Sequence, residues 1–301
     1  MGAYLIEVKN ISKNYGKHQV LKDVSFCIGE KEIVGFIGPN GAGKSTMMKC
    51  MVGLVFPESG SITINGYNIK TEREKALSFT SALIESPGLY PHLSGYDHLK
   101  LVAGLKNVGQ DRIEEMIEFS GLRHRIKVAT GKYSMGMKQR LSLAMALMDR
   151  PKFLILDEPS NGLDPQGMME LRQVLKKLVE EENTSILFSS HYLGEVERVA
   201  DRIIGINHGE IIELPKHIRE QISYRVTLKN NPYSDELMKL FGQFGRVNYL
   251  DSKQYRLILH NEDALLLLIN TLVENKYLIK DIYRESIDIE ELYHEFYEGG
   301  I

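Results

Sequence analysis

The sequence predicts an α/β protein with a largely parallel sheet, followed by a smaller α+β domain. Between about residues 30 and 200, short unbroken apolar runs alternate with helical segments, which is typical of a parallel sheet covered by helices. From about residue 221 the order changes to strand, helix, strand, strand, helix, strand. A chain of 301 residues that is 43% hydrophobic is long enough to build two cores. We therefore expect one domain over residues 1–214 and another over residues 215–301.

Composition argues against several classes of function. The formal net charge of −3 gives no reason to expect a nucleic-acid partner. No apolar run reaches the roughly 18 residues of a membrane-spanning helix, and ALLLLINTLV (264–273) has the length of a buried amphipathic helix. The N-terminus lacks the basic and then apolar pattern of a secretion signal. Cys27 and Cys50 lie in no metal-ligand spacing, so we expect two buried, reduced thiols.

The first ninety or so residues indicate strands and turns, with a single helix that begins near residue 44. YLIEVKNI (4–11) alternates between apolar and polar residues, as a half-buried strand does. EIVGFI (32–37) is a more continuous apolar strand, and GSITING (60–66) is a strand that ends in an Asn-Gly turn.

From Ser94 to Arg150 the pattern becomes helical, with Ser94 and Asp111 as expected N-caps. We interpret residues 91–151 as a helical subdomain inserted into the α/β core. The alternation then resumes with these segments: a buried strand at 153–157, a helix at 167–182, a strand at 185–190 and a helix at 193–200.

The C-terminal region predicts a ferredoxin-like domain with the order βαββαβ and one further helix. The expected strands are SYRVTLK (223–229), VNYLD (247–251), YRLILH (255–260) and LIKDIYR (278–284). The expected helices are SDELMKLFGQF (234–244), ALLLLINTLV (264–273) and DIEELYHEFYE (288–298).

A phosphate-binding loop lies between the strand at 32–37 and the helix that follows it. The residues match G-x-x-x-x-G-K-[ST] and are Gly38, Pro39, Asn40, Gly41, Ala42, Gly43, Lys44 and Ser45, followed by Thr46. Glycines let backbone N–H groups turn toward phosphate oxygens, and the helix N-terminus adds partial positive charge. Lys44 would reach the outer phosphates, and the Ser45 hydroxyl would bind Mg²⁺. The pattern alone does not distinguish a kinase, a GTPase, a helicase or a transporter ATPase.

Two acids follow the buried strand FLIL. Asp157 and Glu158 lie at the carboxyl end of that strand, where ligands of open α/β sheets bind. One carboxylate would hold Mg²⁺ through water and the other would activate the attacking water. Taken alone, a pair of acids at a strand end is common, and the phosphate loop is what makes the catalytic interpretation preferable.

Three further positions could contact a phosphate group or adenine, but their patterns are less specific than that of the phosphate-binding loop. Ser134, with Gly136 behind it, is the expected N-cap of a second helix and hence a second anion site, although any N-cap serine has this pattern. His191 follows the strand SILFSS and would contact a γ-phosphate, although a lone histidine is more often structural. Tyr15 is either a turn aromatic or a platform for stacking adenine.

Taken in chain order, these residues resemble the nucleotide-binding subunit of an ABC transporter over residues 4 to about 212. Tyr15 is similar to the family's adenine-stacking aromatic, residues 38–45 to its Walker A loop, and Ser134 with Gly136 to its C-loop. Asp157 and Glu158 resemble the Walker B aspartate and the catalytic glutamate. Asn161 to Asp164 resemble the D-loop, and Ser190-His191 the switch histidine.

Three positions depart from the family pattern. Met135 replaces the first glycine of the C-loop, and Met137 replaces its glutamine. Glu85 stands where the family has a glutamine that contacts Mg²⁺ and senses the membrane partner. A carboxylate still suits Mg²⁺, but its charge would weaken ATP binding if no cation intervened.

The resemblance implies a fold, partners and a location. It implies a P-loop ATPase in which two subunits, expected to be a homodimer, sandwich two ATPs with Mg²⁺, so that Ser134 serves the other subunit's γ-phosphate. It also implies a membrane permease that docks near residues 85–105, including Tyr90 and Leu93, and places the chain on the inner face of the cell membrane. Glu85 and the Ser-Pro-Gly-Leu-Tyr after it resemble the bacitracin and lantibiotic export and immunity branch.

Two other hypotheses stay open at this stage. One is a soluble ABC ATPase that acts on ribosomes or DNA, although ribosomal members carry two nucleotide domains and repair members insert long coiled coils. Here about 90 residues separate Lys44 from Ser134, without sustained heptads. The other makes residues 215–301 a small-molecule sensor.

Overall fold

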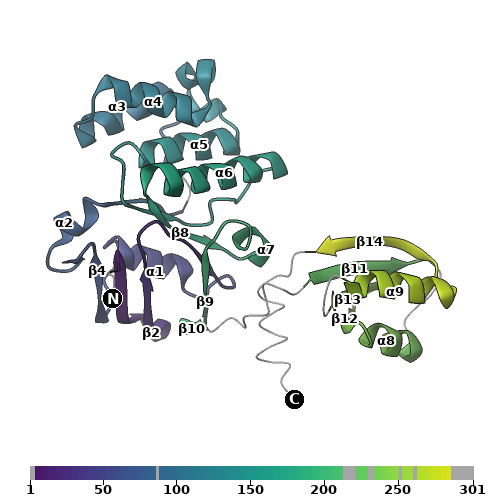
Figure 1. Cartoon of the computed structure of the whole chain (residues 1–301). Helices are drawn as coiled ribbons and strands as arrows, with labels where there is room; N and C mark the ends of the chain where they lie inside the picture. The colour runs from purple at the N-terminus through teal and green to yellow at the C-terminus, as the bar shows by residue number, and fades with distance from the viewer. Residues whose placement is uncertain are drawn as a thin grey trace. The chain divides into compact units, whose positions relative to one another are not determined.

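The structure is a computed structural model of the whole chain, and it describes residues 4–85, 88–212, 222–229, 234–250, 253–259 and 263–285. The chain divides into two compact units, Met1–Glu213 and Leu214–Ile301 (Figure 1). The helix expected at 288–298 lies outside the described residues.

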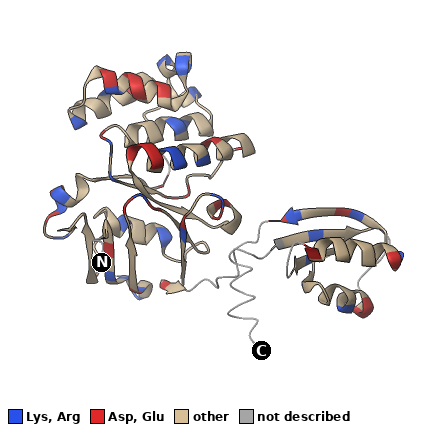
Figure 2. Cartoon of the chain, in the orientation of Figure 1, with Lys and Arg blue, Asp and Glu red and all other residues tan. Residues whose placement is uncertain are grey.

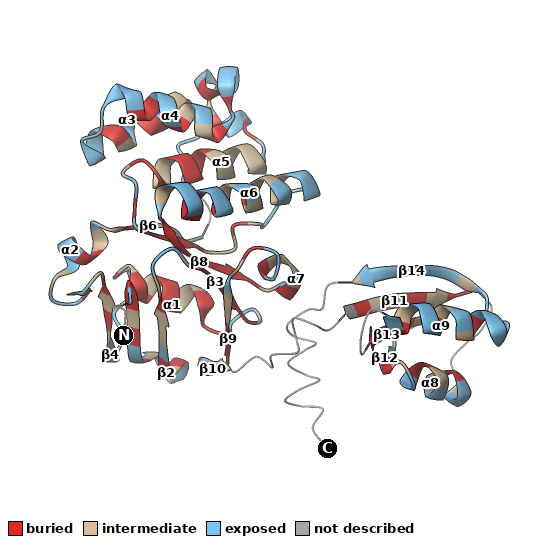
Figure 3. Ribbon diagram, viewed as in Figure 1, coloured by how far each residue is buried: buried red, intermediate tan, exposed pale blue. Residues whose placement is uncertain are grey.

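A six-stranded sheet forms the centre of the first unit. Its strands in spatial order are β10 (Glu210–Ile212), β9 (Arg202–Asn207), β3 (Ile33–Ile37), β8 (Ser185–Ser190), β7 (Phe153–Leu156) and β6 (Thr80–Leu83). All neighbours except β10 and β9 pair in parallel, as the sequence predicts. Every residue of β3, β7 and β8 is buried, because helices cover both faces of the sheet (Figure 3).

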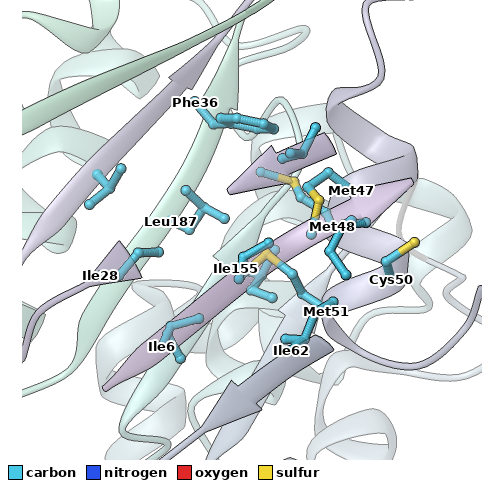
Figure 4. Close-up of a cluster of buried hydrophobic side chains, with 14 of the residues drawn as sticks. Ile6, Ile28, Phe36, Met47, Met48, Cys50, Met51, Ile62, Ile155 and Leu187 are labelled. Carbon is cyan, nitrogen blue, oxygen red and sulfur yellow. The ribbon is translucent and has the colours of Figure 1, made fainter. Parts of the chain in front are cut away.

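A second, antiparallel sheet comes from the N-terminal region. Its spatial order is β2 (His18–Ile28), β1 (Ile6–Tyr15), β4 (Ser59–Ile64) and β5 (Tyr67–Asn68). The Asn-Gly turn after β4 is confirmed, since Asn65 and Gly66 adopt φ values of 50° and 82° and connect β4 to β5. Helix α1 (Lys44–Met51) buries Met47, Met48 and Met51 in a core shared with both sheets (Figure 4).

The helical region holds α3 (Gly95–Lys106), α4 (Gln110–Ser120), the short 3₁₀ turns η1 (Arg123–Lys127) and η2 (Thr130–Lys132), and α5 (Met135–Ala146). The Ser94 cap is confirmed, because its side chain and that of Asp97 form a reciprocal capping box. The cap expected at Asp111 is wrong. The N-cap is Gly109, two residues before Asp111, and Asp111 lies in the first turn of α4, where its charge still suits the helix dipole.

The remaining helices of this unit differ in length from the expectations. Helix α6 (Pro165–Glu182) begins two residues before the predicted segment, because Asp164 and Pro165 start it. Helix α7 (Leu193–Val196) covers only half of the segment expected at 193–200. A short α2 (Arg73–Leu77) was not expected among the N-terminal strands.

The second unit has the predicted βαββαβ order. Its elements are β11 (Ile222–Leu228), α8 (Asp235–Gly242), β12 (Gly245–Tyr249), β13 (Gln254–Leu259), α9 (Asp263–Glu274) and β14 (Ile279–Glu285). The strands form one antiparallel sheet in the order β12-β13-β11-β14. Helix α9 is buried on one face only: Ala264, Leu268 and Leu272 pack in the core, whereas Leu266 and Leu267 are exposed.

The structure agrees only in part with the expectation of two buried, reduced thiols. Both cysteines are free thiols, but only Cys50 is buried, whereas Cys27 is partly exposed. Burial raises the pKa of Cys50 to about 11, so this thiol stays protonated near neutral pH. Within the described part of the chain, no helix has both the length and the apolar character that crossing a bilayer requires.

Candidate functional site

The phosphate-loop residues connect β3 to α1, as predicted, and the glycines are required by the local backbone. Gly41 and Gly43 have φ values of 81° and 111°, in the left-handed region that favours glycine. A Cβ on Gly38 would lie 2.1 Å from the carbonyl oxygen of Ile206 on β9. The loop therefore packs against the neighbouring strand at a distance that only glycine permits.

Lys44 is held within this loop. Its side chain is 6% exposed, and Nζ donates hydrogen bonds to the carbonyl oxygens of Gly38 at 2.6 Å and Pro39 at 3.1 Å. The same Nζ lies 3.4 Å from Oε1 of Glu158. The ammonium group is therefore positioned where the loop meets the carboxylate.

The residues after β7 and β8 form one hydrogen-bonded group. Ser189 on β8 donates from its hydroxyl to Oδ1 of Asp157 at 2.7 Å and accepts from the backbone N–H of Glu158 at 2.8 Å. Glu158 Oε2 lies 2.8 Å from Nδ1 of His191. Glu158 has a φ of 49°, in the left-handed region that is uncommon for a residue other than glycine. Sequence reasoning missed Ser189, and its only signal is a polar residue at the end of a buried strand.

A cavity of about 310 Å³ brings together most of the predicted nucleotide contacts. Its lining residues are Tyr15, Val20, Pro39, Asn40, Gly41, Gly43, Lys44, Ser45, Thr46 and Glu158. The Tyr15 ring is half exposed, with Lys13 Nζ 5.5 Å from its centroid. Ala42 is buried and does not line this cavity, and its backbone instead accepts from Gly209 N–H at 3.0 Å.

Glu85 has a cationic partner that the sequence analysis did not identify. It forms an ion pair with Lys49, which lies one helical turn after Ser45 on α1. The hydrogen bond with Glu85 raises the pKa of Lys49, so this lysine remains charged. Glu85 also lines a cavity of about 530 Å³ together with Asp157 and Glu158. The carboxylate at this position therefore has a counter-charge in the chain itself.

Ser134 and Gly136 lie on a different part of the surface. The Ser134 hydroxyl accepts from Met137 N–H at 3.3 Å and caps α5, as predicted. Ser134, Gly136 and Asp164 line a cavity of about 690 Å³ whose walls do not include the phosphate loop. Asp164 accepts from Gly167 N–H at 2.8 Å and caps α6. The structure thus does not bring Ser134 and Lys44 into one cavity.

Comparison with known proteins shows the family of the chain. The ABC transporter family model matches residues 21–161. A Bacillus subtilis relative, the uncharacterized ABC transporter ATP-binding protein YdbJ, is 41% identical over 244 residues, which cover 80% of this chain and 79% of the relative. The chain belongs to the ABC transporter ATP-binding family. It is an ATPase and the ATP-binding subunit of an ABC transporter, and the α/β fold class is confirmed.

Other members of the ABC family match over a similar length. The bacitracin transport ATP-binding protein BcrA of Enterococcus faecalis is 42% identical, over 70% of this chain and 68% of that protein. The lantibiotic transport ATP-binding protein SrtF of Streptococcus pyogenes is also 42% identical, over 69% of this chain and 89% of that protein. A solved ATP-binding subunit of an ABC transporter is 30% identical with a TM-score of 0.63, and the match covers 79% of this chain and 93% of that one.

Proposed function

We propose that this ABC ATPase hydrolyses ATP with Glu158 as general base. Water attacks the γ-phosphorus, its proton passes to the Glu158 carboxylate, and the bond between the β–γ bridging oxygen and the γ-phosphorus breaks to release ADP. The observation that carries this assignment is the position of Glu158 at the edge of the phosphate-loop cavity, between Lys44 and His191. His191 would hold the carboxylate and contact the γ-phosphate, and Tyr15 would stack on adenine.

Three of the predicted metal ligands, Ser45, Asp157 and Glu85, carry oxygen donors of the kind that Mg²⁺ prefers. This ion prefers one or two carboxylates together with phosphate oxygens and waters, and it does not require a cage made only of protein groups. Ser45, Asp157 and Glu85 offer a hydroxyl and two carboxylates, while the described residues contain no cluster of three or more His, Cys, Asp or Glu. When bound there, Mg²⁺ would neutralise charge that develops on the phosphates.

A second subunit would complete each ATP site. The cavity with Ser134, Gly136 and Asp164 is separate from the one with Lys44, so a single chain presents two half-sites. A dimeric ATP-binding cassette bound to ADP and phosphate, 25% identical to this chain with a TM-score of 0.63, supports a dimer. We expect a two-fold homodimer that closes on ATP and opens after hydrolysis.

The work of the ATPase would be done on a membrane permease. We assign docking to residues 85–105, where Tyr90 and Leu101 are exposed. The relatives named for bacitracin and lantibiotic transport support export of an antimicrobial peptide or a related drug as the transported class. The chain would then act on the cytoplasmic face of the cell membrane, attached through the permease. The nucleotide-binding domain would be residues 1–214, and residues 215–301 an accessory domain.

The Glu158→Gln protein tests this function directly. It would be purified with ATP from solubilised membranes of the native cell, and its companions would be identified by mass spectrometry. We expect a multi-span membrane protein in stoichiometric amount, and the same preparation of Lys44→Ala should retain less of any ATP-dependent companion. Recovery of ribosomes or DNA-repair proteins without a membrane protein would refute the proposed permease partner and leave the ATPase chemistry in place.

A further inference from the structure

A strongly basic surface segment lies between α4 and α5. Residues 119–148, which run from the end of α4 through α5, contain six Lys or Arg and no Asp or Glu, in a chain whose net charge is −3. Four of these cations occupy η1 and η2 and are exposed: Arg123, Arg125, Lys127 and Lys132. We call these four residues the basic cluster. Figure 2 shows basic residues in blue at the upper end of the helical region.

In the described part of the chain, no ion pair joins a residue of the basic cluster to an acid. The ion pairs that do form involve other cations, such as Arg140 with Glu170. The nearby acid Glu115 on α4 is already held by Arg112 and Arg150. Four positive charges are therefore presented together to solvent. A solvated face usually mixes charges of both signs, and this segment does not.

Hydrogen bonds attach this segment to the start of the proposed permease-docking region. Thr130 N–H donates to Leu93 O at 2.8 Å, and its hydroxyl donates to Tyr90 O at 2.8 Å. Gly131 N–H donates to Pro91 O at 2.9 Å, and a Cβ on Gly131 would lie 2.9 Å from that oxygen. Residues 90–93 and 130–132 therefore pack as one piece, and the basic cluster is continuous with the docking region.

The sign of the charge distinguishes the partners available at that place. Cytoplasmic loops of membrane proteins are enriched in Lys and Arg, so a permease loop would on average be repelled by the basic cluster. The cytoplasmic leaflet carries anionic lipids and attracts basic residues. A single-stranded RNA partner is disfavoured because η1 and η2 contain no Phe, Tyr or Trp on which its bases could stack. We propose that the basic cluster contacts anionic lipid headgroups beside the permease, an inference that rests on the proposed function for its location at the membrane.

Vesicle binding by the purified full chain tests this proposal. We expect binding to phosphatidylcholine vesicles that contain phosphatidylglycerol, little binding to phosphatidylcholine alone, and loss of binding as salt is raised. Each basic residue near an anionic surface changes binding roughly fivefold, so Lys127→Gln/Lys132→Gln should weaken it roughly 30-fold. The matched control is Lys31→Gln/Lys176→Gln, which removes one exposed lysine from the turn before β3 and one from α6 and should bind like the unchanged chain.

Several results would overturn the proposal. Equal binding to both kinds of vesicle, or an equal loss in the control variant, would show that the basic cluster does not recognise anionic lipid. Full competition by inorganic phosphate would indicate a site for a free anion, and tighter binding to an RNA oligonucleotide would indicate a nucleic-acid surface. Hydrolysis of ATP without vesicles should be unchanged in both variants, which shows that they fold. If the chain did not bind selectively to anionic vesicles but the permease still co-purified with it, the lipid contact would be refuted and the proposed function would stand.

Discussion

Glu158→Gln separates chemistry from binding at the proposed catalytic carboxylate. Glutamine keeps the size of the side chain and an oxygen for His191, which lies 2.8 Å away, but it does not accept a proton from water. A positioned general base contributes roughly 10²–10⁴-fold, so turnover should fall by that factor. The 3.4 Å contact between Lys44 and Glu158 corresponds to a gross Coulomb attraction of about 5 kcal/mol at an effective dielectric of 20, most of it offset by desolvation. Because ATP phosphates compete for the same ammonium, the variant should bind ATP at least as tightly as the unchanged chain.

Two measurements on one preparation check this reasoning. Phosphate release at saturating ATP gives the turnover number, and equilibrium binding of a fluorescent ATP analogue gives the dissociation constant. Lys44→Ala is the control, because it should lose ATP affinity while Glu158 is unchanged. A variant that retains more than about a tenth of the turnover would refute Glu158 as the base. Weaker ATP binding in Glu158→Gln would contradict the inferred competition for Lys44.

Three other changes have defined outcomes. Gly38→Ala places a Cβ 2.1 Å from the Ile206 carbonyl oxygen, so it should lower the free energy of unfolding by about 1–3 kcal/mol, measured by urea denaturation. The same substitution should also weaken ATP binding. Glu85→Gln removes the charge that pairs with Lys49 and should alter permease-stimulated hydrolysis more than basal hydrolysis; equal stimulation of both forms would contradict this. Burial raises the pKa of Glu32, but hydrogen bonds from the Arg202 guanidinium and the Gly29 N–H together have the larger effect, so the pKa of Glu32 is lowered in the folded protein. The stability that Glu32 contributes is therefore complete at pH values above its pKa in the unfolded chain. As the pH falls through the lower pKa of the folded protein this stability is lost, and the melting temperature should fall with it.

The parts of this structure that depend on local sequence could be predicted. The glycines at 38, 41 and 43 indicate a turn with little room for side chains, and the structure gives the close contact with Ile206 and the positive φ values that require them. The acids after FLIL follow a strand whose residues are all buried. The order βαββαβ of the second unit was predicted correctly, because the apolar residues of each segment repeat with the period of a strand or of a helix.

The parts that depend on tertiary contacts could not be predicted. Lys49 and Ser189 lie 36 and 32 positions from Glu85 and Asp157, their respective partners, and no local pattern connects them. The cap expected at Asp111 failed for a different reason. Asp serves both as an N-cap and in the first helical turn, and Gly109 also provides an acceptable cap, so the sequence left the register open.

The separation of the two half-sites favours assembly of two chains over a rearrangement within one chain. Helix α5 and helix α1 each begin with groups suited to phosphate, yet Ser134 and Lys44 line different cavities of the same chain. A chain that used both for one ATP would have to move α5 against a buried core, since Leu141, Leu143 and Ala144 on α5 are buried. A second chain related by a two-fold axis brings one of each kind together twice without such a movement. In the proposed dimer, the cost of leaving each half-site incomplete in the single chain would be recovered on ATP binding, and this would link closure of the dimer to nucleotide occupancy.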